Sequence, residues 1–191
     1  MKTILVTGGA RSGKSNFAQQ MASDSGKSVL FVATAQAGDD EMRARIAAHQ
    51  SSRPPGWRTL EAPIDVGASI LAEPHERQLV LVDCVTLLVS NAIAEFLSPD
   101  GTEIDEVRAD RAVSAEIEGL LGAISKSKSD FIIVTNEVGL GLVPDNKLGR
   151  VYRDLLGKAN QVLARTADEV YFMVSGISVR LKPPGVQDIR S

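Results

Sequence analysis

Five short runs of apolar, largely β-branched residues recur along the chain, and longer stretches with helical periodicity separate them. None of the runs alternates with polar residues, so we expect each to be a strand covered on both faces, as in a parallel sheet. The expected strands are 3–6, 28–32, 79–82, 131–134 and 170–174, and the expected helices are about 14–24, 40–51, 64–73, 86–97, 108–127 and 147–167. This alternation predicts an α/β fold with a mostly parallel, doubly wound sheet and helices on both faces.

The length of 191 residues favours one domain over residues 1–191, with an extended or frayed tail after about residue 182. The N-terminal apolar run is too short for a signal peptide. No apolar stretch approaches the roughly 20 residues that a membrane helix needs. Because the single cysteine, Cys84, has no internal disulfide partner, we expect a reducing compartment and a cytoplasmic protein.

Composition removes several kinds of site from consideration. The net charge is −3 and aromatic residues make up 4% of the chain, so we expect neither a basic nucleic-acid face nor a base-stacking platform. One cysteine and two histidines, His49 and His75, are too few for a cysteine-based zinc cage or a histidine-rich metal site. The search for chemistry therefore narrows to loops and carboxylates.

A glycine-rich loop lies between the first expected strand and the first expected helix. Its residues, Gly8-Gly9-Ala10-Arg11-Ser12-Gly13-Lys14-Ser15, match the phosphate-binding pattern G-x-x-x-x-G-K-[ST] at every fixed position. Its backbone N–H groups would surround phosphate oxygens, Lys14 would reach the β- and γ-phosphates, and the Ser15 hydroxyl would bind Mg²⁺. A chance match is the alternative, but the strand before the loop and the helix after it are the context that the motif requires.

Asp83 follows the apolar run 79–82 directly, so this strand would deliver a carboxylate to its carboxyl end. Such an aspartate is typical of the Walker B position, which binds Mg²⁺ together with the phosphate-loop hydroxyl. Its alternative is an aspartate that merely starts a turn between strand and helix. The two motifs together predict nucleoside triphosphate binding, but kinases, GTPase switches and motors all share them.

The segment after the second expected strand carries further candidates. We expect this strand to lie beside the phosphate-loop strand, so that Thr34 faces the nucleotide. His49 continues the apolar helix face of Met42 and Ile46. The residues alone leave two interpretations of His49 open: a histidine at a helix end, or a nucleophile that attacks phosphorus while nearby arginines such as Arg53 neutralise charge.

Several motifs, in order, closely resemble the bifunctional adenosylcobinamide kinase / adenosylcobinamide-phosphate guanylyltransferase family of cobalamin biosynthesis. The likeness runs from residue 4 to about 182. The motifs are the phosphate loop with its strand, Ala33-Thr34-Ala35, Asp40-Glu41-Met42 with Arg45-Ile46 and His49, Arg53-Pro54, Trp57-Arg58-Thr59 with Glu61, residues 134–144, Asn160-Gln161 and Val174-Ser175-Gly176.

The resemblance implies a RecA-like P-loop NTPase fold assembled as a homotrimer. It also implies two reactions: adenosylcobinamide is phosphorylated by GTP or ATP, and GMP then passes from GTP to that phosphate through a GMP-histidine intermediate, giving adenosyl-GDP-cobinamide and pyrophosphate. His49 matches the family's histidine, whereas His75 does not, so His49 and Lys14 are the expected catalytic residues.

By the same resemblance, nucleotide contacts are expected at Gly8, Gly9, Ala10, Arg11, Ser12, Gly13, Lys14, Ser15, Ala33, Thr34, Ala35, Gln50, Ser51, Ser52, Arg53, Glu61 and Asp83. Ser15 and Asp83 are the expected Mg²⁺ ligands, and the corrinoid is the expected partner.

Two other functions stay open on the residues alone: a P-loop kinase without transferase activity, and a regulatory module that binds nucleotide without catalysis. The base that would activate the kinase substrate is also open. Glu137, after the fourth apolar run, is one candidate, but its carboxylate is equally expected to order the loop 138–141.

Overall fold

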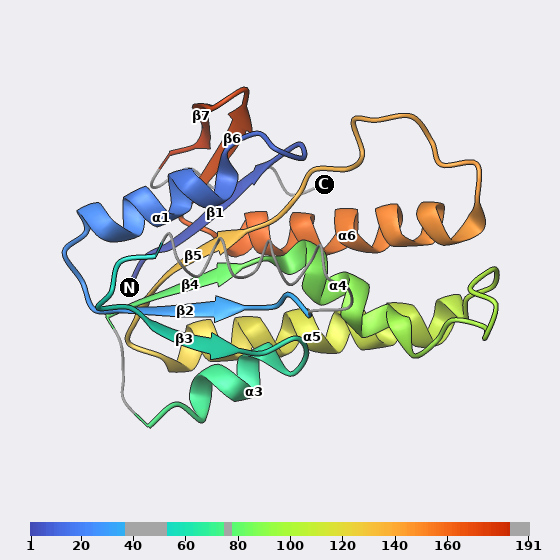
Figure 1. Ribbon diagram of the computed structural model, residues 1–191, viewed down its shortest axis with the longest axis horizontal. Coiled ribbons are helices and arrows are strands. Elements are labelled where there is room, and N and C mark those ends of the chain that lie inside the picture. The colour runs from blue at the N-terminus through green and yellow to red at the C-terminus, as the bar shows by residue number, and fades with distance from the viewer. Residues whose placement is uncertain (37–52, 75–77, 184–191) are drawn as a thin grey trace.

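The computed structural model describes residues 1–36, 53–74 and 78–183, which form a seven-stranded sheet in the order β3-β2-β4-β5-β1-β6-β7 (Figure 1). All neighbouring strands are parallel except β6 and β7, which form an antiparallel hairpin at one edge. The strands are β1 (Thr3–Gly8), β2 (Val29–Ala33), β3 (Arg58–Glu61), β4 (Leu79–Asp83), β5 (Asp130–Val134), β6 (Glu169–Val174) and β7 (Ile177–Lys182).

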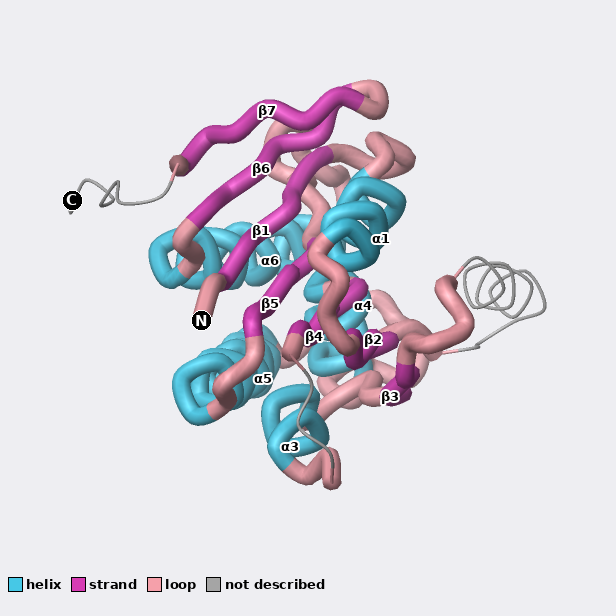
Figure 2. Tube along the Cα trace, turned by 90° about the vertical axis from the view of Figure 1, so that its left-hand side faces the viewer, coloured by secondary structure: helices cyan, strands magenta, loops and turns pink. Residues whose placement is uncertain are grey.

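Helices cover both faces of the sheet. They are α1 (Lys14–Asp24), α3 (Val66–Leu71), α4 (Val85–Ala94), α5 (Glu106–Lys126) and α6 (Lys147–Thr166). Of the described helices, only α1 lies on one face, while the others pack on the opposite face (Figure 2). The predicted mostly parallel α/β sheet with helices on both faces is therefore confirmed. No helix in the described ranges is long and apolar enough to cross a membrane.

Alternation along the central strands divides the buried residues between two cores. In β1, Leu5 joins the core under α4, α5 and α6, whereas Ile4 and Val6 pack with Ala18 and Ala22 of α1. Because both faces of such a strand are buried, its sequence is a continuous apolar run, which is why the sequence pattern found these strands.

The two long helices on the more heavily covered face begin at residues whose side chains cap them. The Asp105 side chain accepts a hydrogen bond from Arg108 N at 3.1 Å, and the Asn146 side chain accepts one from Gly149 N at 2.7 Å. Each cap satisfies a backbone N–H that has no partner within the helix. These caps place the helix starts within two residues of the expected positions.

Two strands were missing from the sequence prediction, and both lie at edges of the sheet. Strand β7 (Ile-Ser-Val-Arg-Leu-Lys) alternates apolar and polar residues, and β3 (Arg-Thr-Leu-Glu) contains a single apolar residue. An edge strand is partly open to solvent, so it lacks the continuous apolar run that marks a buried parallel strand.

The expected position of the second strand was also wrong. Strand β1 lies between β5 and β6, and both β4 and β5 separate it from β2. The order of strands is set by crossovers that no local pattern records, although all the parallel strands still end at one edge of the sheet. The expected helix 40–51, His75 and the tail beyond residue 183 lie outside the described residues.

Candidate active site

The carboxyl ends of the central parallel strands border a cavity of about 500 Å³. This is the edge of an open α/β sheet at which ligands bind. Its lining residues are Arg11, Ser12, Gly13, Lys14, Ser15, Asn16, Phe31, Ala33, Ala35, Arg53, Asp83, Cys84, Thr86, Leu87, Val134 and Asn136. The phosphate loop and Asp83, which are far apart in the sequence, therefore share one cavity.

Glycines shape the phosphate loop where it leaves β1. Gly8 has φ +146°, and a Cβ atom there would lie 2.4 Å from the carbonyl oxygen of Met173, so only glycine fits. At the other end of the loop, Gly13 adopts a left-handed conformation and begins α1. The turn between β6 and β7 supports the loop, because Gly176 N donates a hydrogen bond to Ser12 O at 3.0 Å. This contact gives the Val174-Ser175-Gly176 motif a structural role.

Lys14 is buried within the loop, with its side chain turned back toward the loop backbone. Its Nζ atom donates a hydrogen bond to Gly9 O at 2.5 Å and lies 3.4 Å from Ser12 Oγ. Burial lowers the pKa of Lys14, and the neighbouring Cys84 and Asp83 partly oppose that shift. An ammonium held in place by the loop carbonyl is ready to exchange that contact for phosphate oxygens.

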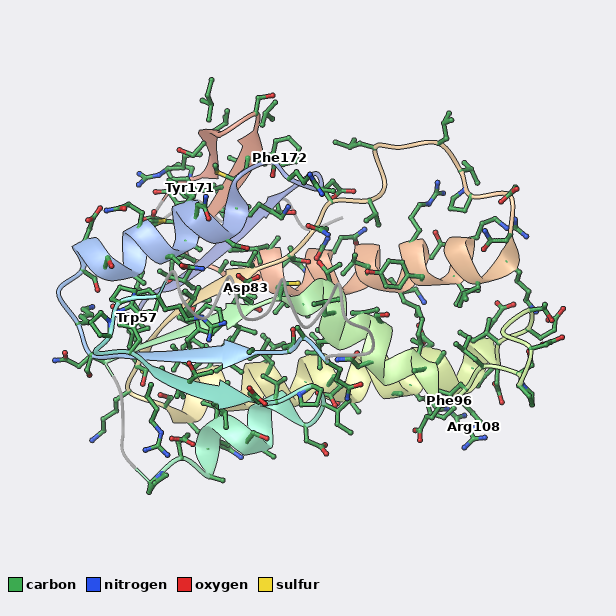
Figure 3. All side chains as sticks on the ribbon, in the orientation of Figure 1. Trp57, Asp83, Phe96, Arg108, Tyr171 and Phe172 are labelled. Carbon is green, nitrogen blue, oxygen red and sulfur yellow. The ribbon has the colours of Figure 1, made fainter. Side chains whose placement is uncertain are left out.

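Asp83 lies at the carboxyl end of β4 (Figure 3), and its carboxylate affects the pKa of three neighbouring side chains. Its negative charge opposes the lowering of the pKa of both Lys14 and Arg53, for which burial is the larger cause. Burial, reinforced by the same carboxylate, raises the pKa of the Cys84 thiol to about 11. The thiol is therefore protonated at neutral pH and is no nucleophile.

Arg53 enters the cavity from the segment before β3. Its guanidinium lies 3.6 Å from the centroid of the Phe31 ring, and Nη1 donates a hydrogen bond to Thr59 Oγ1 at 3.1 Å. Among the described residues, its buried Nε atom has no hydrogen-bond partner. Glu61, at the end of β3, lies close enough to raise the pKa of Arg53, although burial lowers it more. A guanidinium with a spare buried donor suits an anionic ligand.

Thr34 does not face the cavity. Alternation along β2 turns Ala33 and Ala35 toward the cavity, and the Thr34 side chain turns to the opposite face, where it is fully buried. Its hydroxyl donates to Cys84 O at 2.7 Å and accepts from Cys84 N at 2.8 Å. Thr34 therefore fixes the backbone directly after Asp83, and this is a positioning role.

The residues that the sequence predicted for the site divide into three groups. The cavity brings together Arg11, Ser12, Gly13, Lys14, Ser15, Ala33, Ala35, Arg53 and Asp83. Gly8, Gly9, Ala10, Thr34 and Glu61 are described but do not line it. His49, Gln50, Ser51 and Ser52 lie outside the described residues.

The sequence analysis predicted no site role for several residues of the cavity wall, including Thr86 at the start of α4 and Asn136, which lies in the motif 134–144 just beyond β5. The signal that could have found them is their position after the carboxyl end of a buried parallel strand. Glu137 does not line the cavity, and its Oε1 atom accepts a hydrogen bond from Gly139 N at 2.5 Å. Of the two interpretations of Glu137, the structure favours the loop-ordering carboxylate.

Comparison with known proteins identifies the family of the chain. A family model described as cobinamide kinase / cobinamide phosphate guanyltransferase matches residues 4–181. The chain belongs to this cobinamide kinase / cobinamide phosphate guanyltransferase family. The match covers the whole sheet except Thr3 at the start of β1 and Lys182 at the end of β7. Both the phosphate loop and the β6–β7 hairpin therefore belong to the matched family region.

Individual relatives agree with the family model. The chain is 44% identical over 180 residues to the bifunctional adenosylcobalamin biosynthesis protein CobU of Escherichia coli, which covers 94% of this chain and 99% of the relative. It is 43% identical to CobU of Salmonella typhimurium, with the same coverage, and 41% identical to the bifunctional adenosylcobalamin biosynthesis protein CobP of Pseudomonas aeruginosa, over 93% of this chain and 96% of that one.

These matches confirm the family that the sequence motifs predicted. They also confirm the predicted enzyme class, a bifunctional cobinamide kinase and cobinamide phosphate guanylyltransferase of cobalamin biosynthesis. The residues that line the cavity all lie within the part of the chain that the family model matches.

Proposed function

We propose that the protein phosphorylates the terminal hydroxyl of the aminopropanol arm of adenosylcobinamide with GTP or ATP. It then transfers GMP from GTP to the new phosphate, giving adenosyl-GDP-cobinamide and pyrophosphate. The observation that carries this proposal is the convergence of the phosphate loop and Asp83 on one cavity in a chain of this family. One nucleotide site would thus serve both reactions.

Lys14 and Arg53 supply the positive charge that a triphosphate requires. Lys14 lies within the loop and Arg53 lies across the cavity against the Phe31 ring. In the kinase step the corrinoid hydroxyl attacks the γ-phosphorus and loses its proton to water, and the bond from that phosphorus to the β-phosphate oxygen breaks. The nucleoside diphosphate leaves with the electron pair of that bond. Lys14 would stabilise the charge that develops on the β- and γ-phosphate oxygens.

The residues present also fit a magnesium ion. Ser15 offers a hydroxyl and Asp83 a carboxylate in the same cavity, and oxygen ligands of this kind are those that Mg²⁺ prefers. When bound, Mg²⁺ would neutralise phosphate charge and hold the nucleotide in register with the loop. The phosphate-loop pattern and the Walker B position of the sequence likewise predict Mg²⁺ ligands at Ser15 and Asp83.

The guanylyl transfer is assigned to His49. An imidazole nitrogen of His49 would attack the α-phosphorus of GTP, and the bond from this phosphorus to the β-phosphate oxygen would break, releasing pyrophosphate. A phosphate oxygen of the corrinoid would next attack the same phosphorus and break its bond to nitrogen. This ping-pong sequence regenerates His49 and accounts for one GMP transferred per turnover.

Assembly and compartment follow the same resemblance. We propose a homotrimer, in which subunit contacts would cover apolar side chains that the single chain leaves exposed. Such side chains occur on the loop before α6, where Leu140 and Leu142 are 79% and 96% exposed, and on β7, where Ile177 and Leu181 are 68% and 60% exposed. An enzyme that consumes GTP is expected in the cytoplasm. Light scattering on the purified protein measures the trimer directly.

Labelled GTP distinguishes the proposed enzyme from its alternatives. The protein is incubated with GTP that carries its label on the α-phosphate or on the γ-phosphate, and acid-labile protein-bound label is measured after denaturation. We expect label from the α-position only, its loss in His49→Ala, and its retention in the matched variant His75→Ala.

Three other labelling outcomes would contradict parts of this proposal. Label that persists in His49→Ala contradicts the assignment of the intermediate to that residue. A protein that releases γ-phosphate in response to adenosylcobinamide but never carries α-label is a kinase without transferase activity. A protein that does neither is a nucleotide-binding module, and the proposal fails.

A further inference from the structure

Asn136, two residues beyond the end of β5, lies in the wall of the cavity. Strand β5 lies between β4, which ends in Asp83, and β1, which leads into the phosphate loop. Val134 pairs with Asp83 on one side and with Val6 on the other. Asn136 comes two residues later and lines the cavity. Its position is thus between the loop that binds phosphates and the carboxylate that is assigned to the metal.

The side chain of Asn136 is directed to the face of the sheet that carries the phosphate loop. Val134 packs in the core beneath α1 and lines the cavity, and Asn136 has the same parity along the chain. The intervening Thr135 turns the other way, and its hydroxyl donates a hydrogen bond to Asn160 Oδ1 at 2.7 Å. The strand geometry therefore continues past β5 and sends the Asn136 amide into the cavity.

Two helices hold the backbone of Asn136 in place. Its N–H donates to Thr86 Oγ1 at 2.8 Å, from the first turn of α4, and its carbonyl oxygen accepts from Asn160 Nδ2 at 2.9 Å, from α6. Thr86 is itself held by Tyr152, whose hydroxyl donates to Thr86 O at 3.1 Å. Asn160 uses both ends of its amide, one on Thr135 and one on Asn136, so a single side chain fixes both residues.

The Asn136 side chain remains available to a ligand. Within the described part of the chain its amide makes no hydrogen bond, although its backbone N–H and carbonyl are both satisfied. A carboxamide offers two N–H donors and carries no charge, so it binds a phosphate oxygen without repelling it. A pre-positioned donor of this kind costs little to order when ligand binds.

We propose that the side-chain amide of Asn136 binds the γ-phosphate of the nucleoside triphosphate, and that Asn160 is the positioning residue that aims it there. The inference rests on the proposed function of the cavity as a triphosphate site. The loop backbone takes the β-phosphate, and Lys14 together with the metal site spans the β- and γ-phosphates. The γ-phosphate therefore lies toward Asp83, where Asn136 is. Asn136 thus distinguishes a triphosphate from a diphosphate.

Binding of GTP and GDP, each measured by calorimetry in the presence of Mg²⁺ in a His49→Ala background that cannot take up GMP covalently, tests the assignment. One hydrogen bond to a charged phosphate is worth roughly a tenfold to hundredfold change in affinity. We expect Asn136→Ala to weaken GTP binding by that factor and GDP binding by less than about threefold. Asn160→Ala should show the same selective loss at smaller size. Gln161→Ala, an exposed amide next along α6, is the matched control and should keep both affinities.

The selectivity between the two nucleotides decides the outcome. If Asn136→Ala keeps the ratio of GTP to GDP affinity of the His49→Ala parent, or loses both equally, the assignment is overturned. Should Asn136→Ala fail to fold, Asn136→Ser keeps a short polar side chain and gives the same comparison. If the wild-type protein binds GTP but makes no corrinoid product, the proposed function fails, while the affinity ratio still tests Asn136 separately.

Discussion

The hydroxyl of Thr34 binds both backbone groups of Cys84: it donates to the carbonyl oxygen at 2.7 Å and accepts from the amide at 2.8 Å. The two residues directly follow the neighbouring strands β2 and β4 and are 50 positions apart. Because Cys84 directly follows Asp83, this pair fixes the direction in which the chain leaves β4. The geometry of the assigned metal ligand thus depends on a side chain that does not face the cavity.

Replacing Thr34 by valine keeps the shape of the side chain and removes the hydroxyl. Two buried backbone groups of Cys84 lose their partner, so we expect Thr34→Val to lower the free energy of unfolding by about 3 kcal/mol. Thr34→Ser, which keeps the hydroxyl, should lose less than about 1 kcal/mol. Urea denaturation of the two variants checks this prediction. Equal free energies of unfolding for Thr34→Val and Thr34→Ser would show that the hydroxyl does not stabilise the fold.

The glycines of the phosphate loop differ in how much room surrounds them. A Cβ atom at Gly8 would lie 2.4 Å from Met173 O, whereas one at Gly9 would meet nothing within 4 Å. We expect Gly8→Ala to cost about 2 kcal/mol or more of stability and to abolish GTP binding, because the loop must move away from β6. Gly9→Ala should cost less than about 1 kcal/mol of stability. Thermal melts with and without GTP measure both effects, and similar melting temperatures for the two variants would contradict this prediction.

Helices α3 and α5 cross in close contact at Gly67. A Cβ atom there would lie 2.1 Å from the carbonyl oxygen of Gly119. Gly67→Ala must push the helices apart, and we expect a loss of about 3 kcal/mol in the free energy of unfolding. The matched substitution Gly157→Ala in α6 has open space around it and should raise stability by up to about 1 kcal/mol. Denaturant titration gives both values, and a stable Gly67→Ala variant would show that the crossing can relax.

Glu169 anchors the edge of the sheet that is distant from β3. Its buried carboxylate lies 2.6 Å from Lys2 Nζ and 3.0 Å from Arg180 Nη2, and Tyr171 donates a hydrogen bond to it at 2.7 Å. Burial alone would raise the pKa of Glu169, but the hydrogen bonds from Lys2 and Tyr171 and the charges of Lys2 and Arg180 outweigh it and hold the pKa below its ordinary value.

A carboxyl group with a lowered pKa in the folded state stabilises the fold at higher pH. We expect this contribution to be complete above the unfolded glutamate pKa of about 4.3 and to disappear as the pH falls through the lower folded value. Glu169→Gln should therefore lose about 2 kcal/mol at pH 7 and show a flatter decline of stability in acid. The exposed control Glu95→Gln should follow the wild type. Unfolding free energies from pH 3 to 7 decide the matter, and parallel curves for Glu169→Gln and wild type would refute the role.

Local sequence patterns predicted the buried strands and the phosphate loop because both depend on neighbouring residues. Leu79 to Val82 is apolar throughout because both of its faces are covered, and Asp83 could be placed at the cavity because parallel strands end at one edge. Edge strands β3 and β7 escaped prediction because polar residues interrupt both sequences, so neither strand has a continuous apolar run.

The residues that the sequence did not reveal depend on contacts between distant segments. Asn136 belongs to the motif at 134–144, but no site role was predicted for it, and only its hydrogen bonds to Thr86 and Asn160 show how it is held at the cavity. Thr34 was expected to face the nucleotide because it follows a strand at the correct edge. Which face of the sheet its side chain takes follows from the register of β2, and that register placed it against Cys84.

We propose that a single phosphate-loop cavity supports two successive reactions on a corrinoid. The most direct measurement follows adenosylcobinamide by mass spectrometry after incubation with the purified protein, GTP and Mg²⁺. We predict that a phosphorylated corrinoid forms first and is converted to the GDP-linked corrinoid, with one pyrophosphate released per molecule, and that Lys14→Ala forms neither product. GTP consumption without any change in the mass of the corrinoid would contradict the claim.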